Sequence, residues 1–447
     1  MNVLIEKDLQ FEATSMVDPI GRVFRHQCRI FRLVKEKEAA SLYHNLLNSG
    51  YIDPIFKSGL VKTWLPNDIA ISSAELLLEH QRLAFMVHPA EMTNTLITDS
   101  VRMLIHLQKS LFIAGVQLKD CHPWNIMLDK GKPVYIDFGS VVEYSGRFCT
   151  GWYEELKRFY LIPLWLHKVY GEKFSQEYRR EHLKGFGQLF AHHTLIKECG
   201  FPQPVKSDDN IEKISQLLDD ILIWLDQFTL KAEPKQWSGY QQSGDQNDPL
   251  LPVSEKHKFV FEWLSDIQPK IVLDMAANKG FYSEVAARLG GQVICFDNEE
   301  FNVDACNTLA FEKDLNITAV LMDFLHPTPA SGIGLTFPDA YQRFSADTIL
   351  VLGLIHHICI GLGIPLHVFL SFILRYQPSN IIIEFVFTDD IHILPWGKKS
   401  PDDYHIDNLK AILFYAGFML AEERLIGADG VHRAMLTFIK PDLVRGI

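Results

Sequence analysis

The chain of 447 residues contains only seven cysteines, and no two of them stand in a CxxC spacing. They are Cys28, Cys121, Cys149, Cys199, Cys295, Cys306 and Cys359. An odd, scattered set of this kind argues against a disulfide framework or a zinc site and is typical of reduced thiols inside a cell. The N-terminal residues MNVLIEKDLQFEATS also carry acidic side chains too early for a secretory signal peptide. We therefore expect a cytoplasmic protein.

An excess of positive charge is absent as well, since 43 lysines and arginines face 55 aspartates and glutamates, for a formal net charge of −12. Nucleic-acid-binding proteins usually carry a broad basic surface, so we expect no nucleic-acid partner. Residues 348–374 contain no charged side chain, but three histidines, Pro365 and several glycines interrupt the apolar run. This pattern favours a buried strand, a loop and a helix over a membrane span, and no membrane partner is expected.

Prolines, glycines and polar residues gather near the middle of the chain, where the hydrophobic periodicity is lost. We expect a linker over 236–255, between one domain at 1–235 and a second at 256–447. The first domain begins with strands, including an exposed antiparallel pair over 21–34 in which arginines alternate with apolar residues. Helices are expected at 35–47, 99–114 and through most of 152–230. Strands followed by helices indicate an α+β domain.

The second domain has a different pattern, in which short apolar runs are separated by segments of helix length. This is typical of an α/β fold with a doubly wound, Rossmann-like parallel sheet, whose ligands bind beyond the carboxyl ends of the strands. Three runs end in an aspartate: Asp274, Asp297 and Asp323. A single aspartate after a strand is also a common helix N-cap. Three at successive strand ends indicate a shared ligand site.

The residues VLDMAANKGFYSEVAA, from 272 on, resemble the first motif of class I S-adenosylmethionine (SAM) methyltransferases. The resemblance extends over 256–440. It implies that a loop at Asp274, Ala276, Asn278 and Gly280 surrounds the methionine part of SAM, that Asp297 holds the ribose and that Asp323 lies beside the adenine. Ala276 stands where glycine is usual, and we expect it to keep a negative φ.

Methyl transfer to a hydroxyl or amine also requires alignment of the acceptor and removal of a proton. The candidates for a catalytic base are His356, His357 and Glu384, at the ends of the fourth and fifth apolar runs. In the alternative reading, one histidine of the pair only braces its loop. The sequence has no NPPY run and no Pro-Cys nucleophile, so a small molecule, a carbohydrate or a natural-product intermediate is the expected acceptor.

The first domain carries a different motif, LKDCHPWNIMLDKGKPVYIDFGSVV, over 118–142. It resembles the catalytic segment of the protein-kinase and aminoglycoside-phosphotransferase superfamily. The resemblance implies that Asp120 is a catalytic base and that Asn125 and Asp137 bind Mg²⁺ beside ATP. A glycine-rich loop is missing, however, so the domain is expected to be a shortened kinase-like domain, active or inactive. Arg32 is a candidate substitute for the usual lysine.

The complete layout resembles bacterial nodulation-protein-like methyltransferases with a kinase-like N-terminal region. The first hypothesis is a SAM-dependent methyltransferase whose kinase-like domain positions the acceptor. The second is a bifunctional enzyme that phosphorylates a hydroxyl and then methylates, which would add ATP and Mg²⁺ to SAM as cofactors. The third is a non-catalytic scaffold with decayed pockets. The oligomeric state is not predicted.

Overall fold

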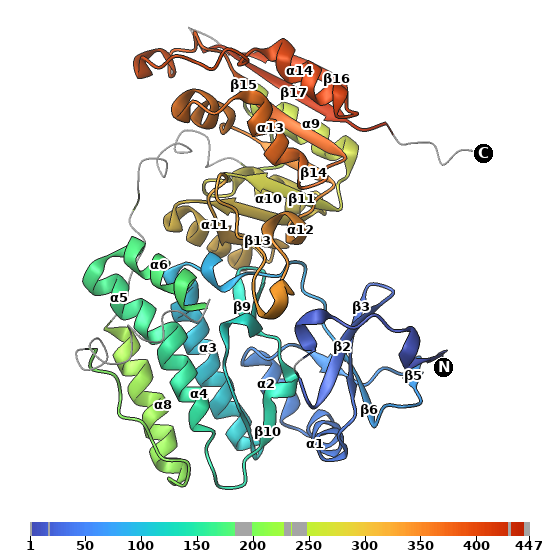
Figure 1. Ribbon diagram of the computed structural model, residues 1–447, viewed down its shortest axis with the longest axis vertical. Helices are drawn as coiled ribbons and strands as arrows, with labels where there is room; N and C mark the ends of the chain where they lie inside the picture. Colours follow the sequence, from blue (N-terminus) through green and yellow to red (C-terminus); the bar gives the residue numbers. More distant parts are fainter. Residues whose placement is uncertain are drawn as a thin grey trace. The chain divides into compact units, whose positions relative to one another are not determined.

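The structure of the protein is a computed structural model that describes residues 2–16, 18–183, 199–227, 234, 248–427 and 431–441. The chain forms two compact units (Figure 1). Unit 1 comprises Met1–Lys231 and Pro329–Pro338, and unit 2 comprises Ala232–Thr328 and Asp339–Ile447. Most of the predicted linker, 236–247, lies outside the described residues.

Unit 1 begins with a four-stranded antiparallel sheet in the order β2-β3-β6-β4. Its strands are β2 (Gly21–His26), β3 (Arg29–Val34), β6 (Leu76–His80) and β4 (Thr63–Trp64). The predicted antiparallel pair over 21–34 is therefore confirmed, but its exposure was predicted wrongly. β3 lies between β2 and β6, so one of its faces packs into a core with Phe31 and Leu33. Arg32 points the other way and is still only 6% exposed.

The rest of unit 1 is mainly helical and is accompanied by three short strand pairs. The helices are α1 (Lys37–Leu47), α2 (Ile52–Lys57), α3 (Asn94–Ile113), α4 (Thr150–Leu156), α5 (Ile162–Tyr170), α6 (Glu172–Leu183) and α8 (Ile211–Asp226). The pairs are β1 (Asn2–Leu4) with β5 (Ile69–Ile71), β7 (Val116–Leu118) with β10 (Val141–Glu143), and β8 (Ile126–Asp129) with β9 (Lys132–Tyr135). α3 begins earlier than predicted because Thr93 caps it, its side chain accepting a hydrogen bond from the Leu96 amide at 3.1 Å.

Unit 2 contains a seven-stranded sheet in the order β13-β12-β11-β14-β15-β17-β16. The strands are β11 (Ile271–Met275), β12 (Gln292–Asp297), β13 (Ile317–Leu321), β14 (Thr348–Val351), β15 (Asn380–Val386), β16 (Met419–Ile426) and β17 (Arg433–Ile439). β11 to β15 pair in parallel, which confirms the predicted parallel sheet, whereas β17 is antiparallel to both β15 and β16. The order reverses at β11, and ligands of doubly wound sheets bind at such a reversal.

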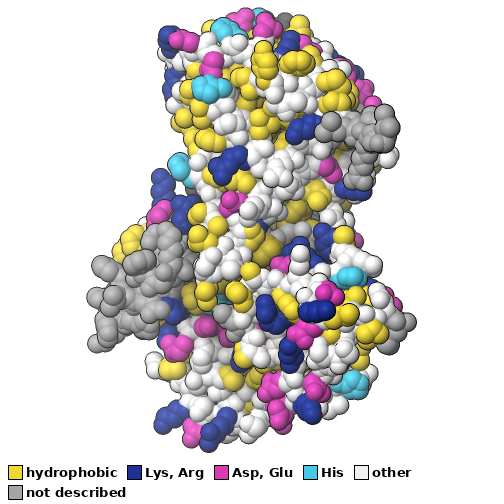
Figure 2. All heavy atoms as spheres, turned by 45° about the vertical axis from the view of Figure 1, so that its right-hand side comes forward, with side chains coloured by type: hydrophobic (Ala, Val, Ile, Leu, Met, Phe, Trp, Pro, Cys, Tyr) yellow, Lys and Arg dark blue, Asp and Glu magenta, His cyan; other side chains and the backbone are white. Residues whose placement is uncertain are grey.

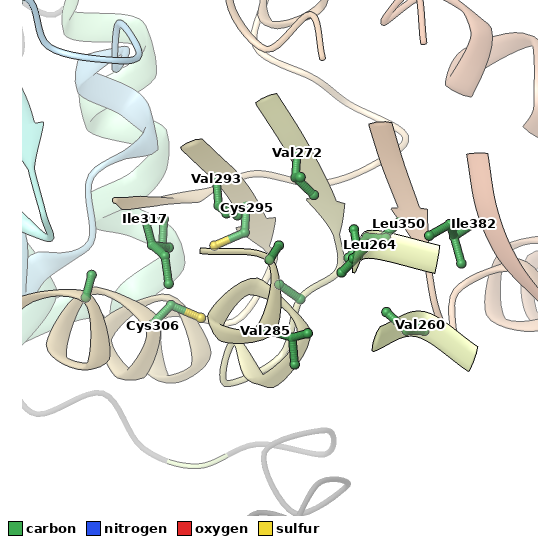
Figure 3. Close-up of a cluster of buried hydrophobic side chains, with 14 of the residues drawn as sticks. Val260, Leu264, Val272, Val285, Val293, Cys295, Cys306, Ile317, Leu350 and Ile382 are labelled. Carbon is green, nitrogen blue, oxygen red and sulfur yellow. The ribbon is translucent and has the colours of Figure 1, made fainter. Parts of the chain in front are cut away.

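One face of this sheet is closed by an apolar cluster that involves three helices (Figure 3). The helices are α9 (Glu255–Ile267), α10 (Phe281–Arg288) and α11 (Glu300–Glu312). Val260 of α9 and Val285 of α10 pack with Val272 and Val293 from the strands. Because the strands are buried, their sequences are almost continuously apolar, and the polar residues that follow them stand out.

The uncharged stretch 348–374 contains β14, a π-helix (His357–Gly361) and α13 (Leu366–Leu374), as predicted except for the π-helix. α12 (Ala340–Arg343) precedes it, and α14 (Ile406–Tyr415) contacts α13. Within the described residues, no helix combines the length and the apolar character that crossing a membrane requires. On the face shown in Figure 2, acidic and basic side chains are interspersed in both units.

Candidate functional site

The carboxyl ends of β11 to β15 meet at one edge of the unit 2 sheet, and the loop after β11 has an unusual backbone there. Ala276 and Asn278 have φ angles of 54° and 51°, and Gly280 has 83°. The expected negative φ at Ala276 was wrong. Left-handed backbone costs a residue with a Cβ roughly 1–2 kcal/mol, so this loop stores strain.

Gly280 lets the loop close onto the sheet before α10 begins. A Cβ at this position would lie 2.8 Å from the sulfur of Cys306, which packs under the loop. The Cys306 thiol in turn donates to the backbone carbonyl of Asn278 at 3.1 Å. The loop is therefore held in a preformed shape by contacts beneath it.

Asp297, the last residue of β12, joins this loop to the start of α11. Its Oδ2 accepts a hydrogen bond from the Asn278 amide at 2.9 Å, and its Oδ1 accepts from the Glu299 amide at 3.0 Å and from the Asn302 side chain at 3.2 Å. Burial raises the pKa of Asp297, although these donors oppose the effect. A carboxylate has about four acceptor positions, so capacity remains for a further donor.

Asp274 lies inside β11 and is 2% exposed. Its Oδ2 accepts from the Ser283 hydroxyl at 2.7 Å. Burial raises the pKa of Asp274 to about 7, which the Ser283 hydrogen bond and the charge of Lys256 only partly offset. Asp274 pairs with Cys295 of the adjacent strand β12, two residues before Asp297, so the two carboxylates belong to neighbouring strand ends.

Asp323 follows β13 by two residues and is more open, with its side chain 43% exposed. Its Oδ1 accepts from the Leu325 amide at 2.9 Å, and its Oδ2 lies 2.9 Å from Nδ1 of His326. The amide of the preceding residue, Met322, donates to the backbone carbonyl of Asp297 at 3.0 Å. Asp323 is thus connected to the same edge of the sheet.

His356 and His357 lie together at the start of the π-helix, with ring centroids 4.0 Å apart. Trp396, from the loop after β15, lies against both rings, at 5.7 Å and 5.3 Å. Burial lowers the pKa of His356 to about 3 and that of His357 to about 4. Both imidazoles are therefore neutral near pH 7, and the buried Nδ1 of His356 makes no hydrogen bond with the described residues.

Glu384, in β15, is fully buried and doubly paired. Its Oε2 lies 2.5 Å from Nζ of Lys256 in α9, and its Oε1 lies 3.0 Å from a guanidinium nitrogen of Arg433 in β17. Burial by itself would raise the pKa of Glu384, but the two cations bring it down to about 2. Such a carboxylate is a weak proton acceptor, and each of its oxygens is already paired with a cation.

Three residues of this site were missed by the sequence analysis: Lys256, Trp396 and Arg433. None of them stands directly at the end of a parallel strand, and the search for polar strand ends therefore passed over them. Arg433 also contacts Asp390 at 3.2 Å, and Lys256 lies 5.5 Å from the ring centre of Tyr282. For Arg433 the available signal was a charged residue at the start of the otherwise apolar strand β17.

In unit 1, two of the predicted kinase-like residues share a partner. The hydroxyl of Ser140 lies 2.8 Å from Oδ1 of Asp120 and 3.0 Å from Oδ2 of Asp137. Asn125 is held next to them through its backbone carbonyl, which accepts from the Ile136 amide at 2.8 Å. Arg32 reaches the same place and donates to Oδ1 of Asp137 at 2.7 Å.

Among the described residues, these side chains do not belong to a cluster of metal ligands. Across the described ranges, no three His, Cys, Asp or Glu side chains come together in a way that could hold a metal ion. The predicted role of Asn125 and Asp137 as Mg²⁺ ligands stays a prediction.

No protein-family model matches the chain. Over 415 residues it is 24% identical to the nodulation protein NoeA of Rhizobium meliloti (strain 1021), and the match covers 85% of each chain. It is also similar to the solved magnesium protoporphyrin IX methyltransferase (ChlM) from Synechocystis PCC 6803 with bound SAH, at 16% identity and a TM-score of 0.32, over 45% of this chain and 97% of that one.

The methyltransferase domain of the bacterial protein CtHen1-C is 13% identical, with a TM-score of 0.31, over 40% of this chain and 94% of that one. Likenesses at these identities and scores decide nothing about function, which has to be argued from the site itself.

Proposed function

We propose that unit 2 is a SAM-dependent methyltransferase acting on a small-molecule, carbohydrate or natural-product acceptor. The observation that carries the proposal is the meeting of Asp274, the strained 276–280 loop and Asp297 at the point where the strand order reverses. The doubly wound parallel sheet is also the fold class that the resemblance to class I methyltransferases implies.

The residues present suit the chemistry of SAM, which carries a positive sulfonium, an α-amino and carboxylate pair, a ribose and an adenine. Asp297 retains acceptor capacity for a ribose hydroxyl. Asp323 is exposed and offers an acceptor for an adenine amino group. Asp274, whose ionisation a cationic group favours, suits the α-amino group, and Lys256, whose charge acts on Asp274, suits the carboxylate. When bound, SAM supplies an electrophilic methyl group.

The chain's own residues then have to orient the acceptor. His356 and His357 are neutral near pH 7, so their ring nitrogens can accept a hydrogen bond from a hydroxyl or amine. The lowered pKa values make the two histidines weak bases. We therefore assign more of the rate enhancement to alignment of the acceptor with the methyl group than to removal of its proton. Trp396 lies against the two rings and helps to fix their orientation.

We assign to unit 1 the role of positioning or recruiting the acceptor. The support for this is that the candidate methyl-transfer residues all belong to unit 2, which leaves unit 1, with its kinase-like segment, for another role. The domain division at 1–235 and 256–447 remains part of the same proposal.

Calorimetric titration of the full chain with SAM and with SAH tests the proposal. The wild-type protein is expected to bind both, and Asp297→Ala is expected to weaken SAM binding by about 1–3 kcal/mol, the cost of losing a charged hydrogen-bond partner. Asp407→Ala is the matched control, because Asp407 is a carboxylate on α14 whose side chain is 91% exposed. Absence of binding by the wild-type protein at millimolar SAM would overturn the proposal.

A further inference from the structure

Arg32 of unit 1 is buried between two carboxylates that come from distant parts of the chain. One amino group of its guanidinium donates to Asp137 at 2.7 Å, and the other donates to Asp18. The three side chains are 7%, 20% and 17% exposed, respectively. An arginine cannot lose its charge in a protein, so it is a permanent counter-ion for both acids.

The backbone after Asp137 is shaped to admit this guanidinium. A Cβ at residue 139 would overlap Nη1 of Arg32, so the close approach depends on Gly139. The Gly139 amide donates to the same oxygen of Asp137 that Arg32 contacts, at 3.0 Å. The second oxygen of Asp137 lies 3.0 Å from the Ser140 hydroxyl. Both oxygens of Asp137 thus have protein partners.

Asp120 is engaged in a similar way. Its Oδ1 accepts from the Tyr135 hydroxyl at 2.9 Å and lies 2.8 Å from the Ser140 hydroxyl. The two acids that a phosphotransferase would use as base and metal ligand therefore share the Ser140 hydroxyl, whose single proton is donated to one of them at a time. Mg²⁺ and Mn²⁺ need free carboxylate oxygens and an approach that is not blocked by another cation.

We propose that Arg32 is a built-in cation that takes the place of a divalent metal ion at Asp137, so that unit 1 keeps a phosphotransferase-like loop without being a metal-dependent phosphotransferase. The inference does not depend on SAM binding by unit 2. It predicts a latent metal site: removal of the guanidinium exposes Asp137, with Asp120 next to it, to solvent cations.

Titration of the full chain with Mn²⁺, followed by the electron paramagnetic resonance signal of the free ion, tests the proposal. The wild-type protein and Asp137→Asn are expected to bind Mn²⁺ equally weakly. Arg32→Met is expected to bind one Mn²⁺ at least tenfold more tightly, and the double variant Arg32→Met with Asp137→Asn is expected to lose this gain. Arg29→Met is the matched control, because Arg29 lies on the same strand and bridges Asp68 and Glu79.

Two results would overturn the proposal. The first is Mn²⁺ binding or Mg²⁺-dependent ATP turnover by the wild-type protein that Asp137→Asn abolishes, and this comparison does not require any Arg32 variant to fold. The second is a folded Arg32→Met variant that binds Mn²⁺ no more tightly than Arg29→Met does. Circular dichroism of each variant shows whether it is folded.

Discussion

Asp137 of unit 1 and Asp274 of unit 2 are aspartates with little exposure to solvent, but they differ in the groups that contact their carboxylates. Asp137 is paired with the permanent charge of Arg32 and accepts a backbone hydrogen bond. Asp274 has the Ser283 hydroxyl as its close partner, and Lys256, a cation whose charge acts on it, is paired with Glu384 instead. The pKa of Asp274 rises to about 7 because burial is not balanced by a direct ion pair.

In the proposed function, the difference is between an acid that stabilises the fold and an acid that contacts a ligand. A buried carboxylate with its own arginine has little to gain from a second cation. A buried carboxylate without one carries a cost that a positively charged ligand can relieve. This is the pattern expected if unit 2 binds a cationic cofactor and unit 1 binds no metal ion.

The largest expected effect on the comparison of Asp137 with Asp274 comes from a substitution at Lys256. Lys256→Met leaves the buried Glu384 with Arg433 as its one ion-pair partner among the described residues, so we expect the free energy of unfolding to fall by about 3 kcal/mol, the lower end of the cost of breaking a buried ion pair, because Arg433 still compensates part of the charge. SAM affinity should fall as well. Lys258→Met on the same helix is the control, since Lys258 is exposed and should show no measurable change. Urea denaturation and calorimetry measure the two effects, and equal losses in both variants would contradict the assignment.

Asp274→Asn tests the same comparison through the pH dependence of the free energy of unfolding. The folded pKa of Asp274 is raised from 3.8 to about 7, so the ionised form is disfavoured on folding. The carboxylate therefore costs stability above pH 7, and this cost disappears as the pH falls towards 4. We expect Asp274→Asn to be more stable than the wild-type protein by roughly 2–4 kcal/mol at pH 8 and equally stable near pH 4. Urea denaturation at both pH values measures this, and a difference independent of pH would count against the raised pKa.

The smallest expected effect concerns the strained loop. Ala276→Gly removes the Cβ from a residue at φ 54°, so we expect a gain of roughly 1 kcal/mol in the free energy of unfolding, less the greater freedom that glycine gives the unfolded chain. Ala277→Gly is the control at an adjacent position that is absent from the positive-φ residues. A loss of stability at 276 as large as that at 277 would show that the loop is not strained there.

Much of the fold of unit 2 was predictable from the sequence. Runs such as IVLDM and QVICFD are almost wholly apolar because β11 and β12 are covered on both faces, and this predicts parallel strands with polar residues where they end. The antiparallel pair over 21–34 was equally readable from its alternation. Its burial was not, because alternation shows which side chains share a face and not what covers that face.

The site was predictable only in part. Asp274 and Asp297 were predicted because each ends an apolar run, and the 276–280 loop was predicted from its small residues. Their closeness in space follows from the parallel pairing of β11 and β12. Glu384 was identified by its strand, but its ion pairs with Lys256 and Arg433 were not predictable. Those cations come from a helix that precedes the sheet and from its antiparallel strand, and no local period connects them.

The sequence by itself determined the parallel strands of unit 2 and the acids at their ends, because hydrophobic periodicity and strand length are local properties. Only the tertiary structure decided which acid meets a cation. Asp137 lies opposite Arg32 and Glu384 lies opposite two cations, whereas Asp274 has a hydroxyl, and these pairings depend on distances between segments far apart in the chain. Electrostatic energy changes with separation and burial, which a linear sequence does not contain.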